Sequence, residues 1–310
     1  MQRKDRNNKL NQWFRRFLTR IYRNVLPKKF AVELLRYLNP RRYKLRKSVI
    51  EFLKNDINNI QSDEKIQILR YFENNPLQML PYQFKEKYKP RNIKVFSESG
   101  GYKYIFRNGK KLYFPKDWKK SAIQSYYNGI LIEQDKNSPH CYFDDDFMGG
   151  GGSLADIGAA EGVWALDNID RAKKAYLFEC DEIWIEALKK TFEPWKDKVV
   201  IINKYISDIT ESNKITIDDF FKDKEINFIK ADIEGAEIKL LKGAKETLKQ
   251  NDLKLALCAY HNQNDEQKLI DILESGGYVV KNSKGYIFFP FGEDCVLPHL
   301  RRGLIFAKKK

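Results

Sequence analysis

Acidic residues and glycines stand together where an apolar run in the second half of the chain meets a helical pattern. The run ends in Asp156-Ile157-Gly158-Ala159-Ala160-Glu161-Gly162. Glycines at such a junction let the backbone approach a ligand without a Cβ in the way. The flanking acids would repel a pyrophosphate and suit a positively charged ligand. We therefore predict a ligand-binding turn here; the alternative is a tight strand–helix turn that binds nothing.

Two later apolar runs end in polar residues that suit an adenosine. Glu179 follows Phe178, where an acid can accept hydrogen bonds from both ribose hydroxyls. Asp181, two residues on, is expected to cap the next helix. The third run ends at Ser207-Asp208. This pair either meets the adenine edge or forms a simple turn.

The fourth and fifth runs end in residues that could act on a substrate. In a doubly wound sheet the fourth strand lies next to the first, so Asp232 is expected in the same crevice as Asp156. A carboxylate there can contact a ligand amino group, orient a hydroxyl or ligate a divalent cation, and Glu234 stands two residues on. His261 ends the fifth run. It is either a general base or, as lone histidines more often are, a structural residue.

These residues need a sheet to bring them together, and the pattern predicts one. Apolar runs alternate with helical patterns, which indicates βαβ units and a mainly parallel sheet, an α/β fold. The two closing strands predict an antiparallel edge. The expected strands are 154–157, 175–179, 199–206, 228–232, 253–260, 278–281, 286–289 and 303–307, and the expected helices are 161–172, 182–192, 216–221, 236–249 and 264–275.

The first half of the chain has a different character. Helical patterns at 10–26, 29–38, 47–60 and 64–74 precede short aromatic and β-branched segments, and Asn108-Gly109 predicts a hairpin turn between the last two of these. Four glycines at 149–152 are expected to form a flexible hinge. We therefore predict three parts: a basic helical region (1–92), a small β-rich or linker segment (93–148), and a ligand-binding domain (149–310).

Four motifs together resemble the FkbM family of S-adenosylmethionine (SAM)-dependent methyltransferases. The motifs are DIGAAEG (156–162), FEC (178–180), FIKADIEGAE (228–237) and LLKGAKETL (240–248), and the segment 133–140 resembles one branch of the family. The resemblance covers about residues 130–310. It implies a class I Rossmann-like methyltransferase fold, SAM as cofactor, and transfer to oxygen, commonly of a sugar in a glycan or natural product. Cys180 stands where the family often has proline.

The resemblance also implies roles for single residues. Glu179 would hold the ribose, and Asp232 and Glu234 would lie at the methyl-transfer end. The family has no agreed base, so His261, His140 and Asp232 all stay candidates. A divalent metal is possible but not implied. Around the methionine part of SAM the resemblance places Asp156, Gly158, Glu161 and Gly162, and Ala159 is also expected to bind the cofactor.

Charge is concentrated at the N-terminus. The net charge is +15, but residues 1–47 hold 16 Lys/Arg against Asp5 and Glu33, which leaves 41 basic and 40 acidic residues in 48–310. Because residues 48–310 are nearly neutral, nucleic acid is not the expected partner. The amphipathic pattern at 10–26, with the basic residues up to 47, predicts either contact with an anionic membrane surface or packing on the rest of the fold.

The chain is therefore expected to be a SAM-dependent O-methyltransferase acting on a saccharide-type hydroxyl. The alternatives are an RNA methyltransferase and a non-catalytic SAM-binding scaffold. The four cysteines are far apart in sequence, which favours reduced thiols, and no apolar stretch is long enough to span a bilayer. A cytoplasmic location is expected, with possible peripheral attachment to a membrane.

Overall fold

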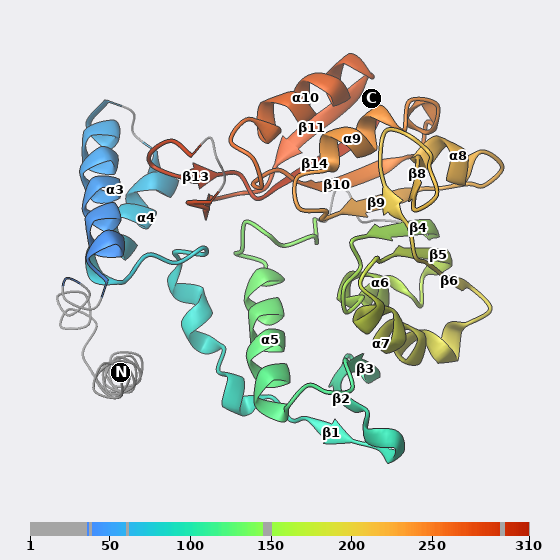
Figure 1. The fold of residues 1–310 in the computed structure, drawn as a ribbon. Coiled ribbons are helices and arrows are strands. Elements are labelled where there is room, and N and C mark those ends of the chain that lie inside the picture. The colour runs from blue at the N-terminus through green and yellow to red at the C-terminus, as the bar shows by residue number, and fades with distance from the viewer. Residues whose placement is uncertain (1–35, 37–38, 60–61, 145–150, 292–294, 310) are drawn as a thin grey trace, which may run out of the picture. The chain divides into compact units, whose positions relative to one another are not determined.

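The computed structural model describes residues 36, 39–59, 62–144, 151–291 and 295–309 (Figure 1). The chain divides into two compact units, residues 1–83 with 295–300, and residues 84–294 with 301–310. The predicted helix at 10–26 lies outside the described residues, as does the one at 29–38 apart from residue 36. Within the described part of the chain, no helix has the length and apolar character needed to cross a membrane.

The first unit contains two helices, α3 (Pro40–Asn59) and α4 (Asp63–Asn74). Helix α3 begins seven residues before the predicted start, because Asn39 accepts the backbone N–H of Arg42 with its side chain and proline is tolerated in a first turn. Ser62 caps α4 as predicted, accepting from the Lys65 N–H. Leu53, on α3, is fully buried in this unit.

Two arginines of the basic region form hydrogen bonds within this unit. Arg46 is buried and donates to the carbonyls of Phe72 and Glu73 at 2.6 and 3.0 Å, at the end of α4. Arg42 donates to the carbonyl of Leu77 at 2.6 Å. The last carbonyls of a helix lack intrahelical partners, so these guanidinium groups stabilise the end of α4.

The second unit is built on a seven-stranded sheet in the order β11-β14-β10-β9-β4-β5-β6. Five strands are parallel, and β14 runs antiparallel to both of its neighbours. This confirms the predicted α/β fold with an antiparallel edge, the strand order of class I methyltransferases. The strands are β4 (Gly152–Ile157), β5 (Ala172–Phe178), β6 (Val199–Ile202), β9 (Phe228–Ala231), β10 (Lys254–Cys258), β11 (Tyr278–Asn282) and β14 (Leu304–Lys309).

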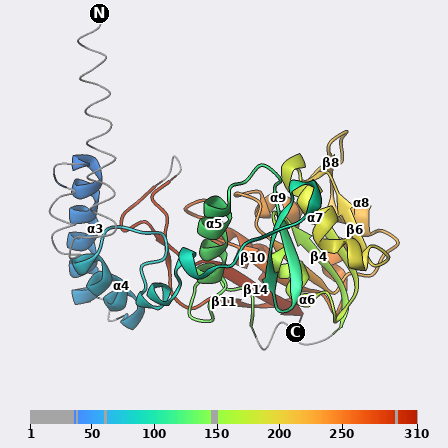
Figure 2. The same ribbon diagram turned by 90° about the horizontal axis from the view of Figure 1, so that it is seen from below.

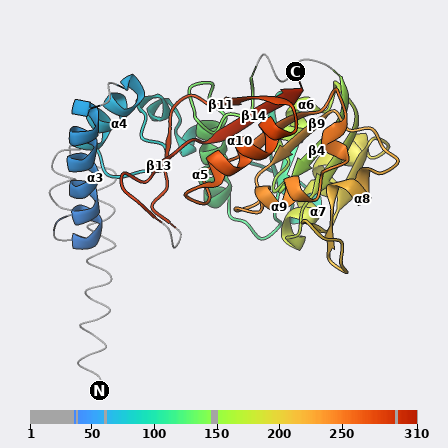
Figure 3. The ribbon, with the colours of Figure 1, turned by 90° about the horizontal axis from the view of Figure 1, so that it is seen from above.

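Helices cover both faces of this sheet. In Figure 1, α9 and α10 lie above the strands and α6 and α7 below them, and Figure 3 shows α9 and α10 in front. The central strands are buried along almost their whole length, as expected of a parallel sheet covered on both sides. The helices are α6 (Val163–Asn168), α7 (Glu182–Phe192), α8 (Ile217–Phe221), α9 (Glu237–Lys242) and α10 (Asp265–Ser275).

Several elements are shorter than predicted. The strand expected at 199–206 is interrupted, and its end is a separate strand, β7 (Tyr205–Ile206), paired with β8 (Lys214–Ile215). The helix expected at 236–249 stops at Gly243, where a Cβ would lie 2.3 Å from the Ser207 carbonyl oxygen. The remaining short strands are β12 (Ile287–Phe288) and β13 (Leu300–Arg301).

A small antiparallel sheet and a helix precede the main sheet. The strands are β1 (Phe96–Ser97), β2 (Lys103–Arg107) and β3 (Lys110–Phe114), and Asn108 and Gly109 both have positive φ, which confirms the predicted hairpin turn. Residues 120–133 form helix α5 (Lys120–Glu133), which the sequence pattern did not predict. Figure 2 shows α5 and the small sheet in front of the main strands.

Candidate functional site

A cavity of about 610 Å³ opens at the carboxyl ends of β4, β5 and β9. This is the position expected for a ligand in a doubly wound sheet. The cavity brings together eight of the residues predicted from the sequence, namely His140, Asp156, Gly158, Ala159, Glu161, Glu179, Asp232 and Glu234. Four predicted residues do not line it, namely Gly162, Ser207, Asp208 and His261.

The turn after β4 depends on Gly158. This residue has φ +71°, and a Cβ there would lie 2.0 Å from the Asp232 carbonyl oxygen. The backbone N–H groups of Gly158 and Ala159 both donate to the Phe178 carbonyl at 3.0 Å. The ends of three neighbouring strands are therefore joined through backbone, which leaves room for a ligand beside the turn.

Gly162 serves the packing of helices instead of the cavity. It has φ +77° and precedes the first residue of α6. A Cβ there would lie 2.7 Å from Leu188 and 2.8 Å from Phe192. Both of these side chains belong to α7, so the glycine allows α7 to approach the turn.

Asp156 is paired with a lysine that sequence reasoning overlooked. Lys230 Nζ lies 2.9 Å from Asp156 Oδ1 and donates to the Gly158 carbonyl at 2.8 Å. Burial disfavours the ammonium charge, but the neighbouring Asp156 and Asp232 carboxylates outweigh it and raise the pKa of Lys230. A lysine within an apolar strand requires such a partner, and that was the available signal. The lysine neutralises Asp156.

Glu161 is a buried acid with no basic partner at hydrogen-bond distance among the described residues. It accepts a hydrogen bond of 2.6 Å from the Tyr126 hydroxyl, and burial raises the pKa of Glu161 to about 7. A cation bound in the cavity would favour the ionised form. This carboxylate therefore suits the positive charges of SAM.

Glu179 is held rigidly at the end of β5. One carboxylate oxygen accepts the N–H of Ala160 at 2.7 Å, and the other accepts those of Cys180 and Asp181 at 2.7 and 2.8 Å. Asp181 caps α7 through the N–H of Ile183, as predicted. Since each carboxylate oxygen has two lone pairs, Glu179 can still accept from a ligand in the cavity.

We expect Glu179→Gln to weaken SAM binding by about 1–3 kcal/mol, about 5–150-fold in Kd, because an amide group replaces a carboxylate oxygen that a ribose hydroxyl would need as its acceptor. Isothermal titration calorimetry with SAM measures this. The control is Glu182→Gln, at an exposed position in the first turn of α7. Equal affinities of the two variants would refute the ribose assignment.

The region predicted to meet the adenine is displaced by the break in the strand. Ser207 donates to Asp208 at 3.1 Å, and both residues lie outside the cavity lining. Lys204, Tyr205 and Ile206 line it instead. The prediction assumed one continuous strand, which placed the polar pair at its end.

Asp232 follows β9 and lines the cavity together with His140 and Tyr142. The Tyr142 hydroxyl donates to Oδ2 at 2.9 Å, and His140 Nε2 lies 3.5 Å from the same oxygen. Burial would raise the pKa of Asp232, but His140 and Lys230 lower it well below its ordinary value. Asp232 is therefore a stable carboxylate, suited to orient a hydroxyl and poorly suited to remove a proton.

His261 lies behind Asp232. Its Nε2 is 3.5 Å from Asp232 Oδ1, and its Nδ1 is 3.3 Å from an oxygen of the fully buried Glu237. Burial opposes protonation, but these carboxylates, Glu237 first, raise the pKa of His261. Glu234 is at the rim, with its side chain 90% exposed. Of the predicted acid–base residues, Asp232 and His140 therefore face each other at the cavity.

Helix α5 supplies the wall that was missed from the sequence. Tyr126, Ile130 and Glu133 lie at helical spacings of four and three, and all three line the cavity. Burial raises the pKa of Glu133, and Asp232 contributes to the same shift. The one available signal was the segment 133–140, which begins with this glutamate.

A known family matches the part of the chain that contains two of the four motifs, 228–237 and 240–248. The family described as methyltransferase FkbM domain matches residues 195–280. A solved FkbM methyltransferase from Methylobacillus flagellatus is 20% identical, with 61% of this chain and 53% of that chain covered and a TM-score of 0.44. A precorrin-6y C5,15-methyltransferase from Geobacter metallireducens is 14% identical, with 53% and 83% covered and a TM-score of 0.37.

The aligned part spans about half the length of the Methylobacillus protein. No curated protein sequence matches the chain. The family match includes Asp232 and the surrounding motif, and the strand order is that of class I methyltransferases. What the comparisons show for this chain is therefore a match to the methyltransferase FkbM domain over residues 195–280.

Proposed function

We propose that this protein transfers the methyl group of SAM to a hydroxyl oxygen of a saccharide-type acceptor. The observation that carries the proposal is the composition of a single cavity. It is lined by the Gly158 turn and Glu179, which we assign to SAM, and by Asp232, His140 and Glu133, which we assign to the acceptor. A donor and an acceptor bound there would be held against each other, which is most of what methyl transfer requires.

The residues present fit SAM. The turn at Gly158 leaves space that a Cβ would fill, Glu179 offers acceptors for ribose hydroxyls, and Glu161 has a carboxyl group that a nearby cation would ionise. SAM, when bound, supplies an electrophilic methyl carbon on a sulfonium. The protein's own residues then have to orient the acceptor oxygen and take one proton.

We assign those two tasks to Asp232 and Glu133. Asp232, a carboxylate at the pH of the cell, orients the acceptor hydroxyl. As the new O–C bond forms and the C–S bond breaks, the hydroxyl proton passes to Glu133, whose raised pKa suits a general base. The products are a methyl ether, a neutral thioether and a protonated Glu133, so charge and atoms balance.

A saccharide fits the lining of the acceptor end. Gln134, Tyr142 and Glu234 can exchange hydrogen bonds with hydroxyl groups, while Tyr126 and Trp184 present aromatic surface. Sugars have both kinds of surface, polar edges and C–H faces. Pockets that position such ligands combine an apolar wall with a few placed polar groups.

The test is a transfer assay with methyl-labelled SAM and the full chain. Extracted glycans, lipid-linked sugars and RNA are offered separately, and we expect the label in a saccharide fraction. The label should remain bound after alkaline hydrolysis, because a methyl ether survives this treatment and a methyl ester does not. Asp232→Asn is the negative control. Label in RNA alone would refute the saccharide assignment. SAM binding without transfer to any fraction would favour a non-catalytic protein.

A further inference from the structure

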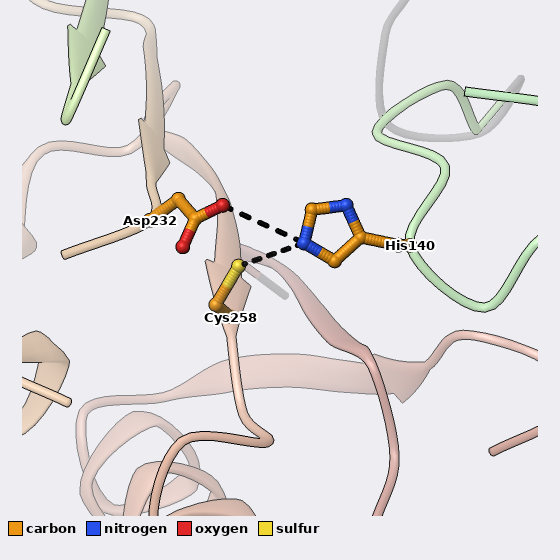
Figure 4. Close-up of side chains that lie close together, drawn as sticks. All are labelled: His140, Asp232 and Cys258. Atoms are coloured by element: carbon orange, nitrogen blue, oxygen red, sulfur yellow. Dashed lines mark hydrogen bonds and ion pairs between the residues drawn. The ribbon is translucent and has the colours of Figure 1, made fainter. Parts of the chain in front are cut away.

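We propose that His140, Asp232 and Cys258 form a binding site for a Zn²⁺-type transition metal ion at the acceptor end of the cavity (Figure 4). The three side chains come from different parts of the second unit: the loop after α5, the end of β9 and the end of β10. Figure 4 shows their donor atoms turned toward one another. The metal's role in catalysis rests on the proposed function, whereas its binding does not.

The separations of the donor atoms are compatible with a shared metal ion. His140 Nε2 lies 3.5 Å from Asp232 Oδ2 and 3.6 Å from Cys258 Sγ. An N–H···O hydrogen bond is usually about 2.7–3.2 Å long, so the contact with Asp232 is long for one, whereas the contact with the Cys258 sulfur is within hydrogen-bond range. Two ligands of a tetrahedral zinc ion, each about 2.0–2.3 Å from the metal, lie about 3.3–3.6 Å apart. One ion could therefore reach all three atoms with small adjustments.

The elements that carry these ligands are firmly placed. Cys258 is the last residue of β10 and pairs with Leu304 of β14. The loop that carries His140 packs closely on Gly303. A Cβ on Gly303 would lie only 2.0 Å from the carbonyl oxygen of Pro139. His140 and Cys258 are both buried. A preformed site of this kind reduces the cost of ordering ligands around an ion.

The donor set selects the class of metal. A thiolate and an imidazole favour zinc and similar transition metals over Mg²⁺ or Ca²⁺, which prefer oxygen ligands. The charges also match, because a Cys258 thiolate and the Asp232 carboxylate together offset a divalent cation. Lys230, the nearby cation, is itself paired with Asp156 at 2.9 Å.

The other side of Asp232 is braced by protein groups. Its second oxygen, Oδ1, lies 3.5 Å from His261 Nε2, and His261 Nδ1 lies 3.3 Å from Glu237. Groups that hold a ligand in place commonly surround metal sites. His261 is therefore a positioning residue for the Asp232 carboxylate, which accounts for its place outside the cavity.

On its remaining side the site adjoins Tyr142, a residue of the cavity lining. The Tyr142 hydroxyl is 2.9 Å from Asp232 Oδ2 and 3.3 Å from Cys258 Sγ, and Tyr142 and His140 both line the cavity. An acceptor hydroxyl that approached the ion from this side would lose its proton more readily, as metal-bound water does. Glu133 lines the same cavity and would receive that proton.

Cobalt titration of the full-length protein tests binding without any methyl-transfer assay. After dialysis against a chelator, Co²⁺ should bind one ion per chain and give a cobalt–thiolate charge-transfer absorption, which Zn²⁺ should abolish. Cys258→Ser and His140→Ala should lose this absorption. Cys141→Ser should keep it, because the Cys141 thiol is buried but faces the carbonyls of Gln134 and Phe143.

The possible results separate the two proposals. No cobalt–thiolate absorption in the wild-type chain, or an absorption that survives in Cys258→Ser, would overturn the metal site, even if saccharides are methylated. Stoichiometric cobalt binding through Cys258 with no transfer to saccharides would support the site and contradict the proposed function. SAM calorimetry on each variant shows whether it has kept its fold.

Discussion

Replacing Glu133 with glutamine is expected to lower kcat about 10²–10⁴-fold and to leave SAM affinity unchanged. The glutamine keeps the size and hydrogen-bonding capacity of the side chain but cannot accept the acceptor's proton. Glu133 lines the cavity from α5, and the groups assigned to SAM belong to the strand ends. Calorimetry with SAM and initial-rate kinetics on an identified acceptor measure the two effects separately.

The pH dependence gives a second readout for Glu133. The base must be ionised to act, so kcat/KM of the wild type should rise with pH through the pKa of Glu133. Burial raises that pKa above the ordinary glutamate value. The increase in kcat/KM should therefore occur at a higher pH than it would with an exposed glutamate as the base. Glu133→Gln should lack this rise. Glu186→Gln, at an exposed position on α7, is the control. An unchanged kcat in Glu133→Gln would move the base to His140.

Gly158→Ala should be among the most destabilising single substitutions in the second unit. A φ of +71° destabilises a residue with a side chain by about 1–2 kcal/mol relative to glycine. The new Cβ would also lie 2.0 Å from the Asp232 carbonyl oxygen, which is a clash. Backbone on β9 would have to move, for a total of about 3–5 kcal/mol. Thermal unfolding should show a clearly lower midpoint, and SAM affinity should fall with it.

Gly109→Ala separates the two contributions. Gly109 has φ +79° in the turn between β2 and β3, but no atom lies within 4 Å of the position that a Cβ would take there. Only the conformational cost applies at this residue, about 1–2 kcal/mol. If Gly158→Ala destabilises the protein no more than Gly109→Ala does, the close contact between the two strand ends is not a constraint on the fold.

The sheet was predictable because its signal repeats. Each apolar strand is followed by a helical pattern, and the polar residues that end the strands fall at one edge by topology alone. Asp156, Glu179 and Asp232 could therefore be placed together from the sequence alone. Their partners could not, because Lys230 meets Asp156 only through the register in which β4 and β9 pair.

The wall of the cavity formed by α5 was missed for a different reason. Helix α5 does not separate apolar from polar residues into a clear stripe, and Lys119, before its first residue, makes no capping hydrogen bond with its side chain. Neither the periodicity nor the start of a helix was visible. Cys258 and His140 could not be joined from the sequence, because 118 residues separate them.

The residues that we assign to the acceptor and those that we assign to SAM come largely from different segments of the chain. Tyr126, Glu133, His140 and Tyr142 all belong to one continuous stretch that ends before β4 begins. The groups assigned to SAM follow that stretch, on the strand ends of the sheet. Because these residues form one uninterrupted segment, replacing that segment would change the side of the cavity that we assign to the acceptor. The residues that we assign to SAM would stay the same.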